Sequence, residues 1–160
     1  MVTLIAAISK NNIIGANGGL PFNCPEDMAH FKRTTTGNVC IFGRKTYEGL
    51  PPKFRPLPNR INIVITRGNN KFEDGVLVFN DLQRAIAHCQ KNFPNKEIFI
   101  CGGAEIYKQS IPFVDRILIS RINVTANGDV EFPDIDWNDF TLTNTHAGDS
   151  MVLETYTRIV

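Results

Sequence analysis

The sequence predicts an α/β fold in which a mostly parallel, eight-stranded central sheet carries helices on both faces and an antiparallel C-terminal strand. Two observations predict it. Strand-like and helix-like segments alternate along most of the 160 residues, which is the pattern of parallel strands joined by helices. The last two strand-like segments instead follow each other directly through Gly148-Asp149-Ser150, which is typical of a hairpin turn.

The predicted strands are short and mostly apolar. Leu4–Ile8 is a continuous apolar run, and Ile61–Thr66 is almost entirely β-branched, a composition that suits a pleated sheet. In chain order the strands are Leu4–Ile8, Val39–Phe42, Ile61–Thr66, Val76–Phe79, Ile98–Cys101, Arg116–Asn123, Phe140–Thr145 and Val152–Ile159. Their order in the sheet does not follow from the pattern.

The predicted helices are recognised by how they begin. Pro25 is a favourable first helical residue, and Glu26 and Asp27 then occupy the first turn of a helix that reaches about Thr35. Asn80 is expected to cap another helix. The other expected helices are Arg44–Leu50, Leu82–Lys91 and a segment from Gly103 through Tyr107, whereas Lys10–Phe22, with Gly15, Gly18 and Gly19, is expected to be a loop.

The composition indicates one domain over residues 1–160. Lys and Arg number 17 against 16 Asp and Glu, so the net charge gives no reason to expect nucleic acid or a membrane surface as a partner. The four cysteines form no C-x-x-C pair and the three histidines show no ligand spacing, so we expect no metal. With no signal peptide and no apolar run long enough to span a bilayer, the expected compartment is the cytoplasm.

Two basic turns lie where predicted strands end. Gly43-Arg44-Lys45-Thr46 follows a strand and begins a helix, whose free N–H groups attract anions. Thr66-Arg67 places a further cation at the end of the next predicted strand. Together these turns suit the phosphates of a nucleotide. The alternative is an ordinary turn with a solvated basic pair and a surface arginine.

Gly102-Gly103 follows another predicted strand. Two glycines there indicate a backbone that approaches a phosphate or a flat ring, or else a tight turn that binds nothing. The sequence contains no G-x-G-x-x-G fingerprint, Walker loop, G-x-S-x-G elbow or H-E-x-x-H pair, so these common site motifs do not apply.

Asp27 is the most informative single residue. By helical spacing it shares a face with Phe31, and Met28 flanks that face. A carboxylate on the apolar side of a helix is costly to bury unless it is paired, which points to a ligand. The alternative is a charge that interacts with the helix dipole, worth about 0.3–1 kcal/mol, and this is the interpretation that we favour for Glu26.

Six segments, taken in order, resemble the dihydrofolate reductase family, and the resemblance runs along the whole chain. They are Leu4–Ile8 with Asn12–Gly15, Leu20–Lys32, Gly43–Glu48, Arg55–Arg60, Gly102–Tyr107, and Gly128-Asp129 with Phe132-Pro133. The resemblance implies a monomeric enzyme that reduces 7,8-dihydrofolate to 5,6,7,8-tetrahydrofolate with NADPH.

The resemblance also implies how the substrate is held. Asp27 would accept hydrogen bonds from the 2-amino group and N3–H of the pterin, Leu57 would pack on the aminobenzoyl ring, and Arg60 would hold the α-carboxylate of the glutamate tail. The substrate-binding residues that it implies are Ile5, Ala6, Asp27, Met28, Phe31, Leu50, Leu57, Arg60, Cys101, Tyr107 and Ser120.

NADPH rather than NADH is the implied cofactor, because Arg67 adds a cation for the 2′-phosphate. The family also implies a cis peptide at Gly102-Gly103, which is rare outside proline. The cofactor-binding residues that the resemblance implies are Ala7, Ile14, Gly15, Gly43, Arg44, Lys45, Thr46, Thr66, Arg67, Gly102, Gly103, Ala104, Glu105 and Ile106. Glu105 departs from the family, which often has a cation there.

The implied chemistry is hydride transfer to pterin C6 with protonation of N5. The catalytic residues would be Asp27, Leu20 and Phe22, with Asp27 favouring the protonated ring and a water delivering the proton. A lid at Asn11–Phe22 would exclude bulk water, braced from outside by Gly128-Asp129. Phe22 stands where the family usually has Trp, so it lacks the indole N–H.

Two other interpretations stay open. One is a folate- or nucleotide-binding protein of the same fold without turnover; a water-excluding lid argues against it. The other is a reductase of the same fold that acts on a different heterocycle, such as a pyrimidine intermediate of flavin synthesis. The combination of Asp27, Leu57 and Arg60 argues against that, because it suits a pterin with a glutamate tail.

Overall fold

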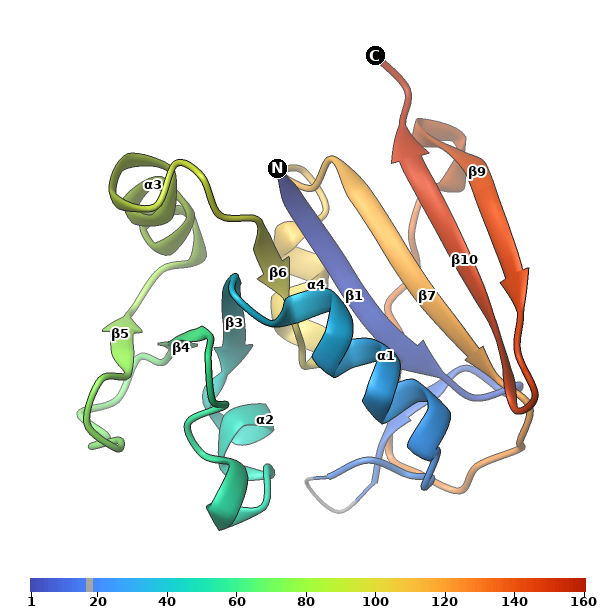
Figure 1. Cartoon of the computed structure of the whole chain (residues 1–160), viewed down its shortest axis with the longest axis horizontal. Helices are drawn as coiled ribbons and strands as arrows, with labels where there is room; N and C mark the ends of the chain where they lie inside the picture. Colours follow the sequence, from blue (N-terminus) through green and yellow to red (C-terminus); the bar gives the residue numbers. More distant parts are fainter. Residues whose placement is uncertain (17–18) are drawn as a thin grey trace.

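The computed structural model describes residues 1–16 and 19–160 and confirms the predicted fold class (Figure 1). Within these residues, eight strands form one sheet in the order β5-β4-β3-β6-β1-β7-β10-β9. The pairs from β5 to β7 are parallel, and β10 runs antiparallel to both β7 and β9. The strands are β1 (Val2–Ile8), β3 (Val39–Gly43), β4 (Ile61–Ile65), β5 (Leu77–Phe79), β6 (Ile98–Ile100), β7 (Arg116–Ile122), β9 (Phe140–Ala147) and β10 (Met151–Arg158).

Helices cover both faces of the sheet, as predicted. They are α1 (Pro25–Thr35), α2 (Arg44–Glu48), α3 (Leu82–Asn92) and α4 (Ala104–Ser110). Buried residues of α3 and α4 pack in one core cluster with Ile41 of β3, whereas Tyr47 of α2 and Phe31 of α1 pack with Phe42 on the other face. Adjacent residues of β3 therefore serve opposite cores, as the period of two in a strand requires. No helix in the two described ranges is long and apolar enough to cross a membrane.

Two predicted helix boundaries need correction. Asn80 does not cap α3; the N-cap is Asp81, whose side chain accepts a hydrogen bond from Arg84 N at 3.2 Å. Asp81 immediately precedes the first helical residue, so its carboxylate reaches the amide of the third. The helix expected over Arg44–Leu50 ends two residues earlier, at Glu48.

The predicted loop Lys10–Phe22 contains a short strand that sequence analysis missed. This strand, β2 (Ile13–Gly15), pairs antiparallel with β8 (Val130–Glu131) in a small separate sheet. Asp129 N donates to Gly15 O at 3.1 Å, so the implied contact of Gly128-Asp129 with the lid is made by the backbone. Residues 17 and 18, which include Gly18 of the predicted loop, lie outside the described residues.

Candidate active site

The two basic turns and the glycine pair meet at the carboxyl edge of the parallel strands. Gly43 N donates to Gly102 O at 2.7 Å, which joins the turn after β3 to the turn after β6. β4 pairs with β3 as far as Ile65 and Gly43, so Thr66 follows at the same edge. Ligands of α/β folds bind beyond this edge. Segments that are far apart in the sequence therefore form one candidate site.

The Gly102-Gly103 peptide is cis, which confirms the implied geometry. An added Cβ at Gly103 would lie 2.9 Å from Thr46 Oγ1, and one at Gly102 would lie 3.1 Å from the Tyr107 ring, at a φ of 108° that favours glycine. The close approach predicted for these glycines is therefore first an approach to side chains of α2 and α4. It packs the two turns against each other.

The cations of the candidate site surround these turns. Arg44 and Lys45 open α2, and Arg67 is exposed just beyond Thr66. Arg44 forms an ion pair with Glu48 at 2.6 Å, but a surface pair of this kind is worth only about 0–1 kcal/mol, so a phosphate can displace it. Neither α2 nor α4 has a side-chain cap, which leaves first-turn N–H groups for another acceptor. This donor set fits an anionic dinucleotide.

Glu105 is the negative charge on this side of the site. It is exposed on α4 and accepts a hydrogen bond from Gln109 Nε2 at 3.1 Å, one turn further along the same helix. The contact occupies one oxygen of its carboxylate.

Asp27 is half-buried in the first turn of α1. Burial raises the pKa of its carboxyl above the ordinary value, while the nearby hydroxyl of Ser120 and the charge of His30 oppose that change. Ser120 is buried on β7, so the carboxyl faces the sheet. The desolvation favours the ligand interpretation of Asp27, because a residue that serves only the helix dipole would lie in water.

Tyr107 supports the same region from α4. Its hydroxyl donates to Ile5 O at 2.8 Å, which fixes β1 against the helix. Burial holds the pKa of Tyr107 well above its usual range, with further contributions from Cys101 and Asp27. The phenol therefore stays protonated and remains a donor at every physiological pH.

Glu26 behaves unlike Asp27 beside it. Its carboxylate accepts from the backbone N–H of Asp149 at 3.1 Å and of Ser150 at 2.9 Å, and these hydrogen bonds lower its pKa. The helix-dipole interpretation of Glu26 missed this contact. No local pattern indicates this contact, because the two partners lie more than a hundred positions away.

The segment expected to hold the substrate tail is organised by Asn62, a residue that sequence analysis missed. Asn62 is buried on β4; its Oδ1 accepts from Leu57 N at 2.9 Å, and its Nδ2 donates to Leu57 O at 3.0 Å and Arg60 O at 3.1 Å. Arg60 Nη1 in turn donates to Thr35 Oγ1 at 3.2 Å. An amide inside an otherwise β-branched strand was the available signal.

The other predicted residues lie on elements around the same edge. Met28 and Leu20 expose 52% and 61% of their surface, which leaves apolar area to cover a flat ring. Ile5, Ala6 and Ala7 lie on β1, Phe31 on α1, Leu50 after α2, Cys101 after β6, Ala104 and Ile106 on α4, Ile14 on β2, and Phe22 before α1.

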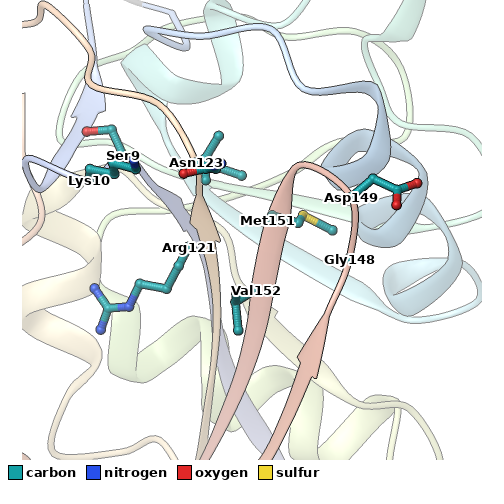
Figure 2. A pocket seen from close by; sticks show the side chains of 9 residues that line it. Ser9, Lys10, Arg121, Asn123, Gly148, Asp149, Met151 and Val152 are labelled. Atoms are coloured by element: carbon teal, nitrogen blue, oxygen red, sulfur yellow. The ribbon is translucent and has the colours of Figure 1, made fainter.

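An open pocket of about 430 Å³ lies elsewhere (Figure 2). None of the predicted site residues lines it, and Arg121 within it is already paired with Glu154 at 2.7 Å. Its lining comes from Ser9, Lys10, Arg121, Ile122, Asn123, Gly148, Asp149, Met151 and Val152. This pocket therefore does not mark the predicted chemistry, and we place the candidate site at the carboxyl edge instead.

Anion-binding turns beside a desolvated carboxyl are what an oxidoreductase needs to hold a phosphorylated nicotinamide cofactor against a flat heterocycle, and this is the class that the fold and site define. Comparison with known proteins narrows it. A sequence model described as dihydrofolate reductase matches residues 1–158, and the chain belongs to the dihydrofolate reductase family.

Individual relatives agree with the family match. The chain is 35% identical to a dihydrofolate reductase of Bacillus subtilis over 92% of this chain and 84% of that protein. It is 42% identical to a dihydrofolate reductase of Neisseria meningitidis over 84% of this chain and 80% of that protein. Among solved structures, a dihydrofolate reductase from Enterococcus faecalis complexed with NADP(H) and RAB-propyl superposes with a TM-score of 0.90 at 34% identity, covering 99% of this chain and 96% of that one.

Proposed function

We propose that this chain catalyses the NADPH-dependent reduction of 7,8-dihydrofolate to 5,6,7,8-tetrahydrofolate. The observation that carries the proposal is the half-buried carboxyl of Asp27, whose raised pKa and contact with Ser120 suit a pterin edge. The test is oxidation of NADPH by the purified protein, followed by absorbance with and without dihydrofolate. Ligand binding without NADPH oxidation across pH and salt would instead support a binding protein of the same fold.

Asp27 holds and polarises the substrate. Its two oxygens accept from the 2-amino group and N3–H of the pterin, a charge-assisted pair that orients the ring. The negative charge then favours a proton on N5, which a water delivers. When bound, NADPH supplies the hydride that reaches C6. Leu20 and Phe22, before α1, close over this region and keep bulk water out.

Arg60 and Leu57 select a substrate with a glutamate tail. The guanidinium of Arg60 is oriented by its contacts with Thr35 and with Pro58 O, the latter at 2.9 Å from Nε, and its planar fork matches a carboxylate. Leu57 is buried, with 8% of its surface exposed, and supplies an apolar side chain close to it in the sequence.

Replacing Asn62 with alanine is expected to raise the KM for dihydrofolate, because three hydrogen bonds that hold Leu57 and Arg60 disappear. Unsatisfied backbone groups of this kind cost about 1–3 kcal/mol each, so the free energy of unfolding should fall as well. Steady-state kinetics and urea unfolding measure both effects. Use of a dihydropterin without a glutamate tail should be much less affected; an equal loss would contradict the tail assignment.

Arg67 is proposed to bind the 2′-phosphate of NADPH, with Arg44, Lys45, Thr46 and Thr66 around the other phosphates. Replacing Arg67 with glutamine is expected to raise the KM for NADPH about tenfold and to leave that for NADH nearly unchanged, since a hydrogen bond to a charged group is worth about 1.5–3 kcal/mol. The matched control is Arg84→Gln, an exposed arginine on α3. Equal changes for both cofactors would remove Arg67 from this role.

We also propose that the protein acts as a monomer in a reducing compartment. Its four cysteines, all of which are unpaired, support the reducing compartment, and the monomeric state is what the family resemblance implies. Light scattering after gel filtration tests the oligomeric state.

A further inference from the structure

The turn between β9 and β10 lies directly on the Glu26 carboxylate. Besides the two amide contacts described above, an added Cβ on Gly148 would lie 2.5 Å from Glu26 Oε2. Figure 2 shows this turn, with Gly148 and Asp149 labelled, beside the ribbon of α1. The contact joins the first turn of α1 to a segment more than 120 positions away along the chain.

The start of α1 has few other polar attachments. Its N-cap, Cys24, makes no side-chain cap hydrogen bond, and Pro25 has no N–H to donate. Cys24 packs in a small buried cluster with Ile122 and Met151. Glu26 therefore adds directional hydrogen bonds to an otherwise apolar contact, and directional bonds fix the rotation of a helix better than apolar packing does.

Glu26 and Asp27 face neighbouring strands of one sheet. Glu26 binds the turn that opens β10, and Asp27 faces Ser120 of β7. These strands are paired in register, with Ser120 opposite Leu153 and Ile122 opposite Met151. Because Glu26 is bonded to the turn beside β10 and Cys24 packs with Ile122 of β7, this end of the helix has a fixed height and rotation above the sheet.

We propose that Glu26 is a positioning residue, which holds the Asp27 carboxyl in its desolvated place over Ser120 by fastening the first turn of α1 to the β9–β10 turn. The inference rests on the proposed function, in which Asp27 binds the pterin. It assigns the effect to the hydrogen-bonded contact rather than to the charge of Glu26.

The charged and titratable groups near the two carboxylates are few. Asp27 is approached by His30 from its own helix and by the Tyr107 phenol from α4, and Glu26 by His146 from β9. None of these is altered by the variants below, so changes in the titration of Asp27 report on Glu26 and the turn.

Glu26→Ala removes the contact, and Glu26→Asp keeps the charge but shortens the reach by one methylene. Gly148→Ala breaks the contact from the hairpin side with Glu26 intact, and Gly148 does not have a positive φ that alanine would resist.

We expect all three variants to raise the KM for dihydrofolate about five- to tenfold, with the dissociation constant of NADPH within twofold of the parent. The double variant Glu26→Ala/Gly148→Ala should be no worse than either single one. Ser150→Ala, which keeps the backbone N–H, is the control and should match the parent.

The decisive measurement is a carbon-13 NMR titration of the Asp27 carboxyl in the ligand-free protein. When the contact is lost, water reaches the carboxyl, so the pKa of Asp27 should fall toward its ordinary value in all three variants. If Glu26→Asp titrates as the parent while Glu26→Ala and Glu26→Gln both change, the charge acts and the proposal is overturned. A lower Tm with unchanged kinetics and titration also overturns it.

Should the parent fail to oxidise NADPH, the proposed function falls, but the titration still decides whether Glu26 positions Asp27. If Glu26→Ala does not fold, the titration of Gly148→Ala decides this.

Discussion

Replacing Asp27 with asparagine is expected to lower kcat/KM for dihydrofolate about 10²- to 10³-fold at neutral pH, because general acid–base participation by one side chain is typically worth about 10²–10⁴-fold. The amide keeps the shape of the carboxyl but cannot carry the charge that favours a proton on N5. The deficit should shrink in acid, where more of the substrate arrives already protonated. Stopped-flow or steady-state kinetics from pH 5 to 9 measure this.

The same substitution should make the ligand-free protein more stable at neutral pH. The pKa of Asp27 is raised in the folded state, so the folded protein binds its proton more tightly than the unfolded chain does. The stability that this proton contributes is present below the unfolded value of 3.8 and is lost as the pH rises through the folded pKa. The free energy of unfolding of the Asp27→Asn variant, measured with urea, should therefore be higher than that of the parent at pH 7 and equal to it near pH 3. The control for the unfolding measurement is Asp134→Asn, which changes an exposed aspartate.

In the kinetic experiment, parent-like activity of Asp27→Asn at every pH would exclude Asp27 from the mechanism.

Replacing Gly128 with alanine is expected to lower kcat about tenfold through the lid. An added Cβ would lie 2.3 Å from Gly15 O and 2.5 Å from Ile13 Cγ2, so the loop before β8 must move away from β2. Overpacking of this kind costs about 1–3 kcal/mol, and the nearest contact to give way is Asp129 N to Gly15 O. Single-turnover measurements with NADPH separate hydride transfer from product release.

The matched control for Gly128 lies in the lid itself. Among the residues that the structure describes, none has an atom within 4 Å of a Cβ added at Gly19, so Gly19→Ala adds a methyl group to the same region without a clash with them. A loss of activity in Gly19→Ala equal to that in Gly128→Ala would show that glycine flexibility, and not the fit between the two loops, matters here.

The strands and long helices of this chain follow from local pattern, because each is defined by its own residues. Pro25 and the acidic first turn place α1, and the β-branched run from Ile61 places β4. β2 could not be found in this way, since a three-residue strand has no measurable period and exists through its pairing with β8. Asp81 was missed as the cap because two adjacent residues, Asn80 and Asp81, are both good caps and differ only in position.

The residues of the candidate site also fall into those that local sequence indicates and those that only the folded structure brings together. Asp27 and the glycine turns were found because each breaks the expected local composition, and Arg60 was found through the resemblance to the dihydrofolate reductase family. The partners that orient them were not: Glu26 reaches the β9–β10 turn, and Asn62 bonds the backbone of Leu57, which no periodicity records. The burial of the Asp27 carboxyl near Ser120 favours a ligand role over a helix-dipole role, and this burial exists only once the sheet has formed.

The position of β1 affects how the protein is made. This strand is synthesised well before its two neighbours in the sheet, β6 and β7, which span residues 98–122. The growing polypeptide must therefore carry an unpaired apolar strand on the ribosome until residues 98–122 have been translated, and non-local pairing of this kind is slow. Nascent chains arrested before residue 98 should need chaperones to stay dispersed, while those released after β7 should collapse to a protease-resistant form.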